Sequence, residues 1–176
     1  LSLDDIENDW GAMFGKLSWV DKRQGTGDLL AGLPLWVCKT VGGTTVHWAG
    51  ASLRFKDHEF RARSQYGEIE GANLLDWPID PNEMERFYSM AEDKMGTTGT
   101  HGIPRLPGNN NYQVMEYGAK ALGYTDVHTG NMSINSQPRD GRPGCHQIGF
   151  CMAGCAIGAK WSTLYTEIPK AEATGR

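Results

Sequence analysis

The feature that most constrains this chain is a set of three cysteines, Cys145, Cys151 and Cys155, which lie within eleven residues. A structural zinc site normally takes four protein ligands, and His146 lies too close to Cys145 to join it in a tetrahedral site. A disulfide would use two thiols and leave the third over. Three thiolates fit an iron–sulfur cluster with three irons, because each iron takes one external sulfur ligand. The spacing matches no standard ferredoxin pattern, so small buried side chains that pack under a loop remain an alternative.

The fourth cysteine of the chain, Cys38, lies far upstream of the other three. Since zinc prefers four ligands, this thiol would have to complete a zinc site together with Cys145, Cys151 and Cys155. The cysteines alone therefore leave a small zinc-binding module open as an alternative to the cluster.

Composition and charge exclude several classes of protein. Of the 176 residues 39% are hydrophobic, and the formal net charge is only −4, so we do not expect a disordered chain. The isoelectric point near 5.7 and the scattered Lys and Arg residues argue against a nucleic-acid partner. The longest apolar stretch, 29–38, contains Gly32 and Pro34 and is too short to cross a bilayer. We expect one domain of ordinary size, without a membrane span of its own.

A glycine-rich segment, 41–50, is the first candidate for ligand binding. Paired glycines, Gly42 and Gly43, let backbone N–H groups approach a ligand, and Thr44 and Thr45 add hydroxyl donors. If a helix begins here, its first amides would favour phosphate oxygens. The segment then adds a polar and a stacking group that a plain turn does not need, in the order His47, Trp48, Ala49. A tight turn between two elements remains the alternative interpretation.

Local signals predict one helix clearly, from Asp80 to Met95. Asp80 can cap it, Pro81 suits its first position, Glu83 completes a capping box, and Gly96 follows its last turn. Its apolar side chains fall on one face at spacings of three and four, which predicts a face that packs into the core. These are Met84, Phe87, Tyr88, Ala91 and Met95.

The remaining elements are shorter and give a mixed α and β fold class, α+β or α/β. A second helix is predicted over 112–122, with Asn111 as its cap. Its apolar face consists of Val114, Met115, Ala121 and Leu122. Short strands are expected at 124–127 and 132–134, and the stretch 161–173 is expected to be only partly helical because it contains Pro169.

Three blocks together resemble the glucose–methanol–choline (GMC) oxidoreductase family. Residues 42–48 resemble its flavin-contacting segment, and 76–92 are similar to its "DWPI…LEPYY…AE" stretch. Residues 142–159 look like the three-cysteine segment of one branch, the large flavoprotein subunits of bacterial sugar and polyol dehydrogenases. The blocks occur in the family's order, which makes the match far more specific than any one of them.

The resemblance implies an enzyme that binds FAD and oxidises a CH–OH group of a sugar, polyol or sugar acid by hydride transfer to the flavin. It places seven residues near the cofactor: Gly42, Gly43, Thr44, Thr45, His47, Trp48 and Ala49. In some sugar oxidases the histidine that matches His47 bonds covalently to the flavin. A cluster-free GMC alcohol oxidase or dehydrogenase remains the nearest alternative.

In the bacterial branch, cysteines that match Cys145, Cys151 and Cys155 hold a [3Fe-4S] cluster. This cluster passes electrons to a multihaem cytochrome c subunit, and a small accessory subunit assists export. The resemblance therefore also implies a periplasmic location, with membrane association through a partner subunit.

The sequence departs from the family pattern at both ends. The N-terminal G-x-G-x-x-G unit of the Rossmann βαβ and the C-terminal region with the catalytic histidine have no counterpart in it, so we assign no catalytic residue. We expect an internal fragment of the FAD-binding fold in three parts. These are a flavin-lid and FAD-contacting segment (1–56), a mainly helical segment on the substrate-domain side (57–130), and a cysteine-rich segment returning to the FAD domain (131–176).

Overall fold

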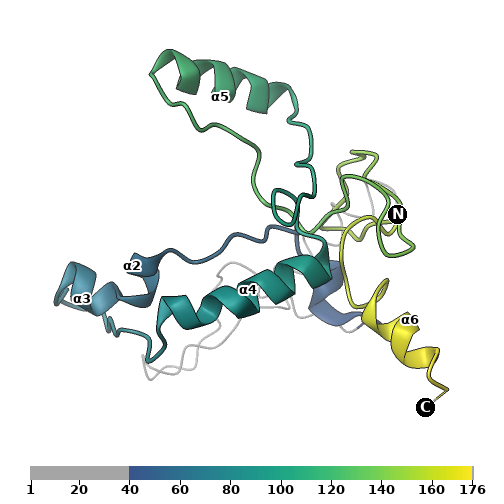
Figure 1. Cartoon of the computed structure of the whole chain (residues 1–176), viewed down its shortest axis with the longest axis horizontal. Helices are drawn as coiled ribbons and strands as arrows, with labels where there is room; N and C mark the ends of the chain where they lie inside the picture. Colours follow the sequence, from purple (N-terminus) through teal and green to yellow (C-terminus); the bar gives the residue numbers. More distant parts are fainter. Residues whose placement is uncertain (1–39, 176) are drawn as a thin grey trace, which may run out of the picture. The chain divides into compact units, whose positions relative to one another are not determined.

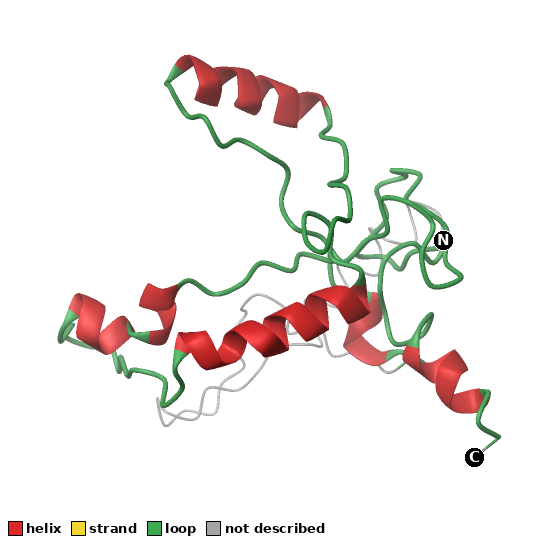
Figure 2. Cartoon of the chain, viewed as in Figure 1, coloured by secondary structure: helices red, strands yellow, loops and turns green. Residues whose placement is uncertain are grey.

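The structure, a computed structural model, describes residues 40–175 and is mainly helical there, with long connections (Figures 1 and 2). Its elements are the 3₁₀ turn η2 (Gly43–Val46) and the helices α2 (Asp57–Phe60), α3 (Ala62–Tyr66), α4 (Pro81–Met95), α5 (Asn110–Ala121) and α6 (Glu167–Glu172). β-structure in this range is limited to isolated antiparallel bridges, which join Ala51 to Met132, Ile134 to Lys160 and Arg139 to Arg142. The expected mixture of α and β is therefore only partly confirmed.

The chain divides into two compact units. Among the described residues, the first unit contains 40–49, 148–156 and 162–175, with η2 and α6. The second contains 50–147 and 157–161, with α2 to α5. The three predicted parts, 1–56, 57–130 and 131–176, stay a prediction, and Cys38 lies outside the described residues.

Helix α4 begins and ends where its local signals predict. The carboxylate of Asp80 accepts a hydrogen bond from the backbone N–H of Asn82 at 2.9 Å, and Pro81 is the first helical residue. The carboxylate thus bonds the amide of Asn82, not that of Glu83 as a capping box requires. Gly96 follows the last residue, and its N–H donates to the carbonyl of Asp93 at 3.2 Å.

The predicted core face of α4 is wrong in its details. Phe87 and Ala91 are exposed, while Met84, Tyr88 and Met95 are only half-buried. The buried side chain of this helix is Glu92. Its two oxygens accept hydrogen bonds from Nε and Nη2 of Arg54, both at 2.7 Å. An ion pair, which the spacing of apolar residues cannot reveal, determines which side of this helix is buried.

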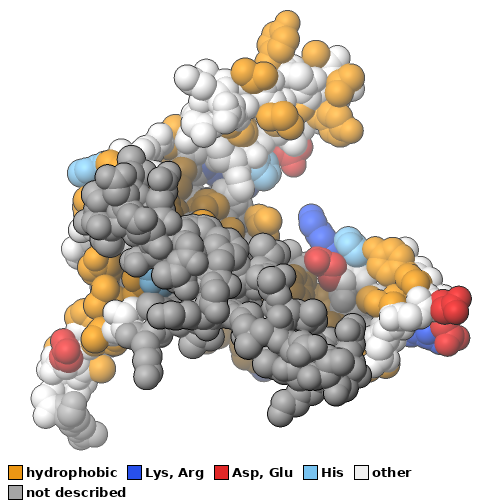
Figure 3. All heavy atoms as spheres, turned by 180° about the vertical axis from the view of Figure 1, so that it is seen from behind, with side chains coloured by type: hydrophobic (Ala, Val, Ile, Leu, Met, Phe, Trp, Pro, Cys, Tyr) orange, Lys and Arg blue, Asp and Glu red, His pale blue; other side chains and the backbone are white. Residues whose placement is uncertain are grey.

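Helix α5 also differs from its prediction. It begins at Asn110, and its cap is Asn109, whose side chain accepts from the backbone N–H of Tyr112 at 3.0 Å. The predicted cap, Asn111, lies inside the helix. The predicted apolar face does not enter a core, and Figure 3 shows hydrophobic side chains exposed along this helix. Its four members, Val114, Met115, Ala121 and Leu122, are all exposed.

Of the two predicted strands, residues 124–127 form a loop. The backbone N–H of Tyr124 donates to the carbonyl of Ala119 at 3.1 Å, and the carbonyl of Val127 accepts from the hydroxyl of Tyr112 at 3.3 Å. These groups are thus engaged by α5 and its end, and are not available for a ladder. The short strand expected at 132–134 is present only as two isolated β-bridges, which Met132 and Ile134 form.

The centre of the second unit is a buried polar cluster around Ser133, which we call the Ser133 network. The Ser133 N–H donates to the carbonyl of Gly50 at 2.7 Å, and its carbonyl accepts from the N–H of Trp161 at 2.9 Å. Its hydroxyl lies 2.6 Å from that of Ser52 and 3.0 Å from that of Thr97. Ser133 and Thr97 are fully buried, so these bonds offset the cost of removing the polar groups from water.

The pairing of Arg54 yields a test of what holds α4 in place. Both Glu92 and Glu85 bond to this guanidinium and raise its pKa, but the Glu92 side chain is 5% exposed and that of Glu85 is 67% exposed. Glu92→Gln should lower the free energy of unfolding by about 2 kcal/mol, because it leaves the pair without its buried anion. Chemical denaturation of the purified protein measures this change.

The matched control for this test is Glu85→Gln, which removes the second carboxylate from the same guanidinium. Because that pair is open to solvent, its loss should cost less than about 0.5 kcal/mol. Equal effects of the two substitutions would show that burial of Glu92 contributes nothing to stability.

Candidate functional site

The predicted flavin-contacting segment forms a tight turn in the first unit. The hydroxyl of Thr45 donates to the carbonyl of Gly42 at 2.6 Å, and the hydroxyl of Thr163 donates to the same carbonyl at 2.8 Å. The N–H of Thr163 in turn donates to the Thr45 hydroxyl at 3.1 Å. Thr45 therefore fixes the turn against the segment before α6. Thr163 was not predicted, because its partner lies more than one hundred residues away in the sequence.

The expected helix N-terminus does not form at this turn. The element η2 is one 3₁₀ turn of four residues, Gly43–Val46. The N–H of Gly43 donates to the carbonyl of Thr40 at 2.9 Å, so it is already occupied. A single 3₁₀ turn is too short to provide the helix N-terminus that would direct aligned amides at a phosphate group.

A cavity of about 470 Å³ lies beside this turn in the first unit. It is lined by Thr44, Thr45, His47, Trp48, Ala49 and Met152. Five of the seven predicted cofactor residues thus share one cavity, and the other two, Gly42 and Gly43, begin the turn that carries them. The lining combines an indole ring, a thioether and hydroxyl groups, a mixture that fits one portion of a flavin cofactor.

One hydrogen bond joins the cavity to the segment that carries two of the cysteines. Nδ1 of His47 lies 2.7 Å from the backbone carbonyl of Met152. Because a carbonyl can only accept, we infer that Nδ1 carries a proton. Met152 stands between Cys151 and Cys155. It was not predicted at the site, since a backbone acceptor has no sequence signature.

The three cysteines are half-buried, but the described structure does not gather them around a metal. Cys151 and Cys155 belong to the first unit, and Cys145 belongs to the second. Within residues 40–175, no three His, Cys, Asp or Glu side chains form a group that could hold a metal ion. The thiol of Cys145 accepts a hydrogen bond from the N–H of Gln147, with N and Sγ 3.3 Å apart. The three-cysteine site therefore stays a prediction.

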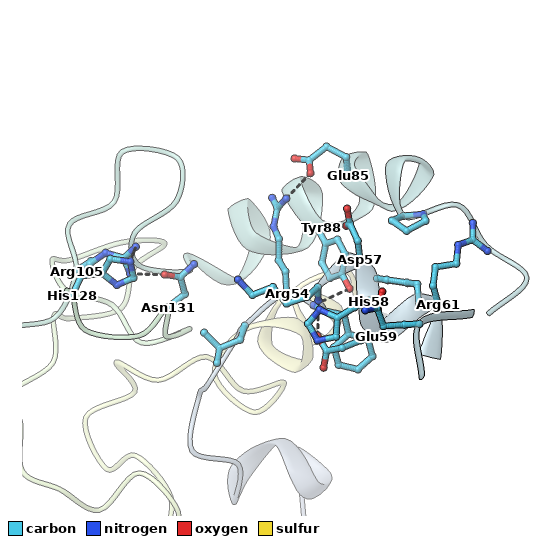
Figure 4. Close-up of a pocket in the computed structure, with 16 residues that line it drawn as sticks. Arg54, Asp57, His58, Glu59, Arg61, Glu85, Tyr88, Arg105, His128 and Asn131 are labelled. Atoms are coloured by element: carbon cyan, nitrogen blue, oxygen red, sulfur yellow. Dashed lines mark hydrogen bonds and ion pairs between the residues drawn. The ribbon is translucent and has the colours of Figure 1, made fainter. Parts of the chain in front are cut away.

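The second unit contains a larger cavity, of about 1340 Å³, which the sequence did not predict (Figure 4). Its charged and histidine side chains come from four separate parts of the chain. These are Arg54, Lys56, Asp57, His58, Glu59, Arg61, Glu85, Arg105 and His128. In Figure 4, Arg105, His128 and Asn131 lie together on one side, apart from the group around Arg54 and Glu85.

Comparison with known proteins identifies the family. Residues 32–175 match the pattern of the family described as GMC oxidoreductase. This chain belongs to that family. It is 35% identical over 152 residues to the fructose dehydrogenase large subunit of Gluconobacter japonicus, covering 79% of this chain and 27% of that protein. It is 30% identical over 151 residues to the 2-methyl-1,2-propanediol dehydrogenase of Mycolicibacterium austroafricanum, covering 80% of this chain and 27% of that protein.

A shorter match covers a third of the chain. Over 67 residues it is 33% identical to the gluconate 2-dehydrogenase flavoprotein of Pantoea cypripedii, covering 34% of this chain and 11% of that protein. The GMC chain described here spans about a quarter of the length of the first two relatives. Within residues 40–175, no helix combines the length and the apolar character that crossing a membrane requires.

The two glycines of the turn allow a matched test of how the turn beside this cavity packs. Gly42 has a φ of +94°, and a Cβ added to it would lie 2.8 Å from Cβ of Leu164 and 2.8 Å from Cγ2 of Val46. Gly42→Ala should therefore lower the free energy of unfolding by about 3 kcal/mol, through backbone strain and overpacking. Denaturation, together with the FAD content of the purified holoenzyme, measures the effect.

Gly43→Ala is the control. Gly43 also has a positive φ, +57°, but a Cβ there would meet no atom within 4 Å. Gly43→Ala should lower the free energy of unfolding by only about 1 kcal/mol, from backbone strain alone. If Gly42→Ala lowered the free energy of unfolding as little as Gly43→Ala, this would contradict the close packing of Gly42 against Leu164.

Proposed function

We propose that this GMC chain is part of an FAD-dependent dehydrogenase that oxidises a CH–OH group of a sugar, polyol or sugar acid. Family membership supports the flavin, and the relatives named above are dehydrogenases of a sugar, a diol and a sugar acid. On this proposal, the chain supplies a middle segment of the FAD-binding fold, and the catalytic base comes from another part of the enzyme.

The observation that carries the proposal is the position of His47. This side chain lines the cavity of the first unit together with Thr44 and Trp48. Its Nδ1 is held at 2.7 Å by the carbonyl of Met152. A ring fixed in this way keeps one orientation and one tautomer, which a group placed beside a redox cofactor needs.

The residues of the turn would contribute to cofactor binding in different ways. FAD, when bound, supplies a two-electron acceptor for the hydride that leaves the alcohol carbon. The hydroxyl of Thr45 is used to fix the turn, whereas no hydrogen bond of the Thr44 hydroxyl is recorded within residues 40–175. Thr44 is exposed at the cavity, so it is the threonine that can donate to the cofactor. Trp48 offers an apolar ring surface.

A finer part of the proposal concerns the electrons. We propose that Cys145, Cys151 and Cys155 hold a [3Fe-4S] cluster, which relays electrons to a cytochrome c subunit in the periplasm, and that a small accessory subunit joins the complex. The presence of three cysteines in a segment that resembles the three-cysteine segment of the family supports this, as does the N–H of Gln147, which donates to the thiol of Cys145. Such N–H···S bonds tune cluster potentials. One relative is named a large subunit, which implies partner subunits for that protein.

The competing function is a cluster-free GMC oxidase or dehydrogenase. It is favoured by the half-burial of the three thiols. In that enzyme the cysteines would pack as small apolar side chains.

The first test uses the holoenzyme made from the complete gene. Anaerobic addition of D-fructose, D-gluconate or 2-methyl-1,2-propanediol in turn should bleach the flavin absorbance with at least one of them. The enzyme should then reduce one-electron dyes quickly and use oxygen slowly. Stoichiometric formation of peroxide would favour the oxidase, and a protein purified with zinc and no flavin would overturn the whole proposal.

The second test separates the cluster from the flavin. Anaerobically purified holoenzyme should contain about three irons and four acid-labile sulfides per chain. Cys151→Ala should remove this iron and lower the rate of dye reduction at least tenfold, while substrate still bleaches the flavin absorbance. Met152→Leu, next to it, keeps the backbone carbonyl that bonds His47 and should retain its iron. Native enzyme that contains flavin but no iron would contradict the relay and leave the flavin assignment standing.

A further inference from the structure

The guanidinium of Arg105 is held rigidly in the wall of the large cavity. Its Nη1 donates to the carbonyl of Thr129 at 2.8 Å and to Oδ1 of Asn131 at 2.5 Å. Its Nη2 lies 3.4 Å from Nε2 of His128. Nδ1 of His128 faces the carbonyl of Thr129 at 3.0 Å, so Nδ1 is the donor and Nε2 can accept from the guanidinium. These three contacts leave the side chain of Arg105 little freedom to lose when it binds a ligand.

Gly99 makes this position of Arg105 possible. It has a φ of +78°, and a Cβ added to it would lie 2.6 Å from Cζ and from Nη1 of Arg105. The guanidinium therefore lies against bare backbone, in a space that a larger residue would fill. Together with Thr129 and Asn131, this glycine holds the guanidinium in one position.

The charge of Arg105 is not balanced by its own partners. Its partners are a backbone carbonyl, an amide oxygen and an imidazole, and no carboxylate among residues 40–175 forms a recorded ion pair with it. Oδ1 of Asp126 lies 3.7 Å from Nε2 of His128, one residue removed from the guanidinium. Arg54, in the same cavity, is paired with both Glu92 and Glu85. The cavity is lined by four cationic and three anionic side chains, and Glu92, which pairs with Arg54 from outside the lining, makes the numbers equal.

The donors of Arg105 that remain are arranged for a carboxylate. Nη1 bonds to Thr129 and Asn131, and Nη2 gives one of its two N–H groups to His128, while Nε has no recorded bond within residues 40–175. The edge formed by Nε and Nη2 therefore retains N–H groups for a ligand. This edge presents two nearly parallel N–H bonds, which match the two oxygens of a carboxylate.

We propose that Arg105 is the carboxylate-binding residue of a sugar-acid site in this cavity. The acidic side chains across the cavity, Asp57, Glu59 and Glu85, supply acceptors for the hydroxyl groups of such a ligand. The inference refines the proposed function, on which it rests, by naming a sugar acid as the substrate class. Neutral sugars lack the group that Arg105 recognises.

The experiment measures binding to the holoenzyme by calorimetry, with D-gluconate, D-glucose and D-glucose 6-phosphate as probes. D-gluconate should bind more tightly than the other two. Arg105→Gln should weaken D-gluconate binding about 10- to 100-fold, as expected for a charge-assisted pair, and should leave D-glucose binding unchanged. Arg105→Lys keeps the positive charge but not the two parallel N–H groups of the guanidinium. Its affinity for D-gluconate should therefore lie between that of native enzyme and that of Arg105→Gln.

Arg61→Gln is the matched control, because Arg61 also lines the cavity and its recorded bond is a long one, 3.5 Å to the carbonyl of Trp77. It should change the affinity for D-gluconate less than twofold. An equal loss in both variants would overturn the proposal, as would tighter binding of the sugar phosphate or no binding of D-gluconate. If Arg105→Gln fails to fold, the comparison of Arg105→Lys with native enzyme decides in its place.

Failure of this inference differs from failure of the proposed function. If neutral sugars or polyols still bleach the flavin while Arg105 variants bind D-gluconate as native enzyme does, only the sugar-acid site is wrong. If no alcohol reduces the flavin, the proposed dehydrogenase itself is wrong.

Discussion

Satisfaction of buried polar groups is the constraint on which the second unit depends. Within residues 40–175, four hydrophobic side chains are buried, Phe60, Ile103, Ile134 and Ala159, and buried polar ones outnumber them. The Ser133 network joins residues 50–52, 97 and 161 through backbone and hydroxyl bonds. Asn135 extends it, since its amide nitrogen donates to the carbonyls of residues 139, 142 and 143. A buried donor or acceptor without a partner is costly, so these bonds select one arrangement of the loops.

The sequence predicted what is encoded locally. Helix α4 was found because Asp80, Pro81 and Gly96 act within a few residues of the helix they delimit. The bridge between Ala51 and Met132 could not be found, because its members are 81 residues apart and neither has a distinctive signal. The apolar faces of α4 and α5 were placed in a core by their periodicity, which detects an amphipathic helix but not what covers it.

The candidate sites show the same division between local and distant information. The turn that contains Thr44 and Trp48 was predicted from its glycines and from the family resemblance, and five of its residues do share a cavity. Its supports, Thr163 and the carbonyl of Met152, were missed because they come from distant segments and carry ordinary chemistry. Arg105 was missed for a related reason, since a single arginine in a loop has no motif until its neighbours are known.

The division into two units has a practical consequence for anyone who engineers this protein. The chain passes from one unit to the other after residues 49, 147, 156 and 161, so neither unit is a continuous stretch of sequence. Trimming the gene from either terminus cannot isolate one of them, and a reporter domain fused at a presumed linker would interrupt a folded body. Isolating one unit calls instead for a short designed linker in place of each segment that belongs to the other unit.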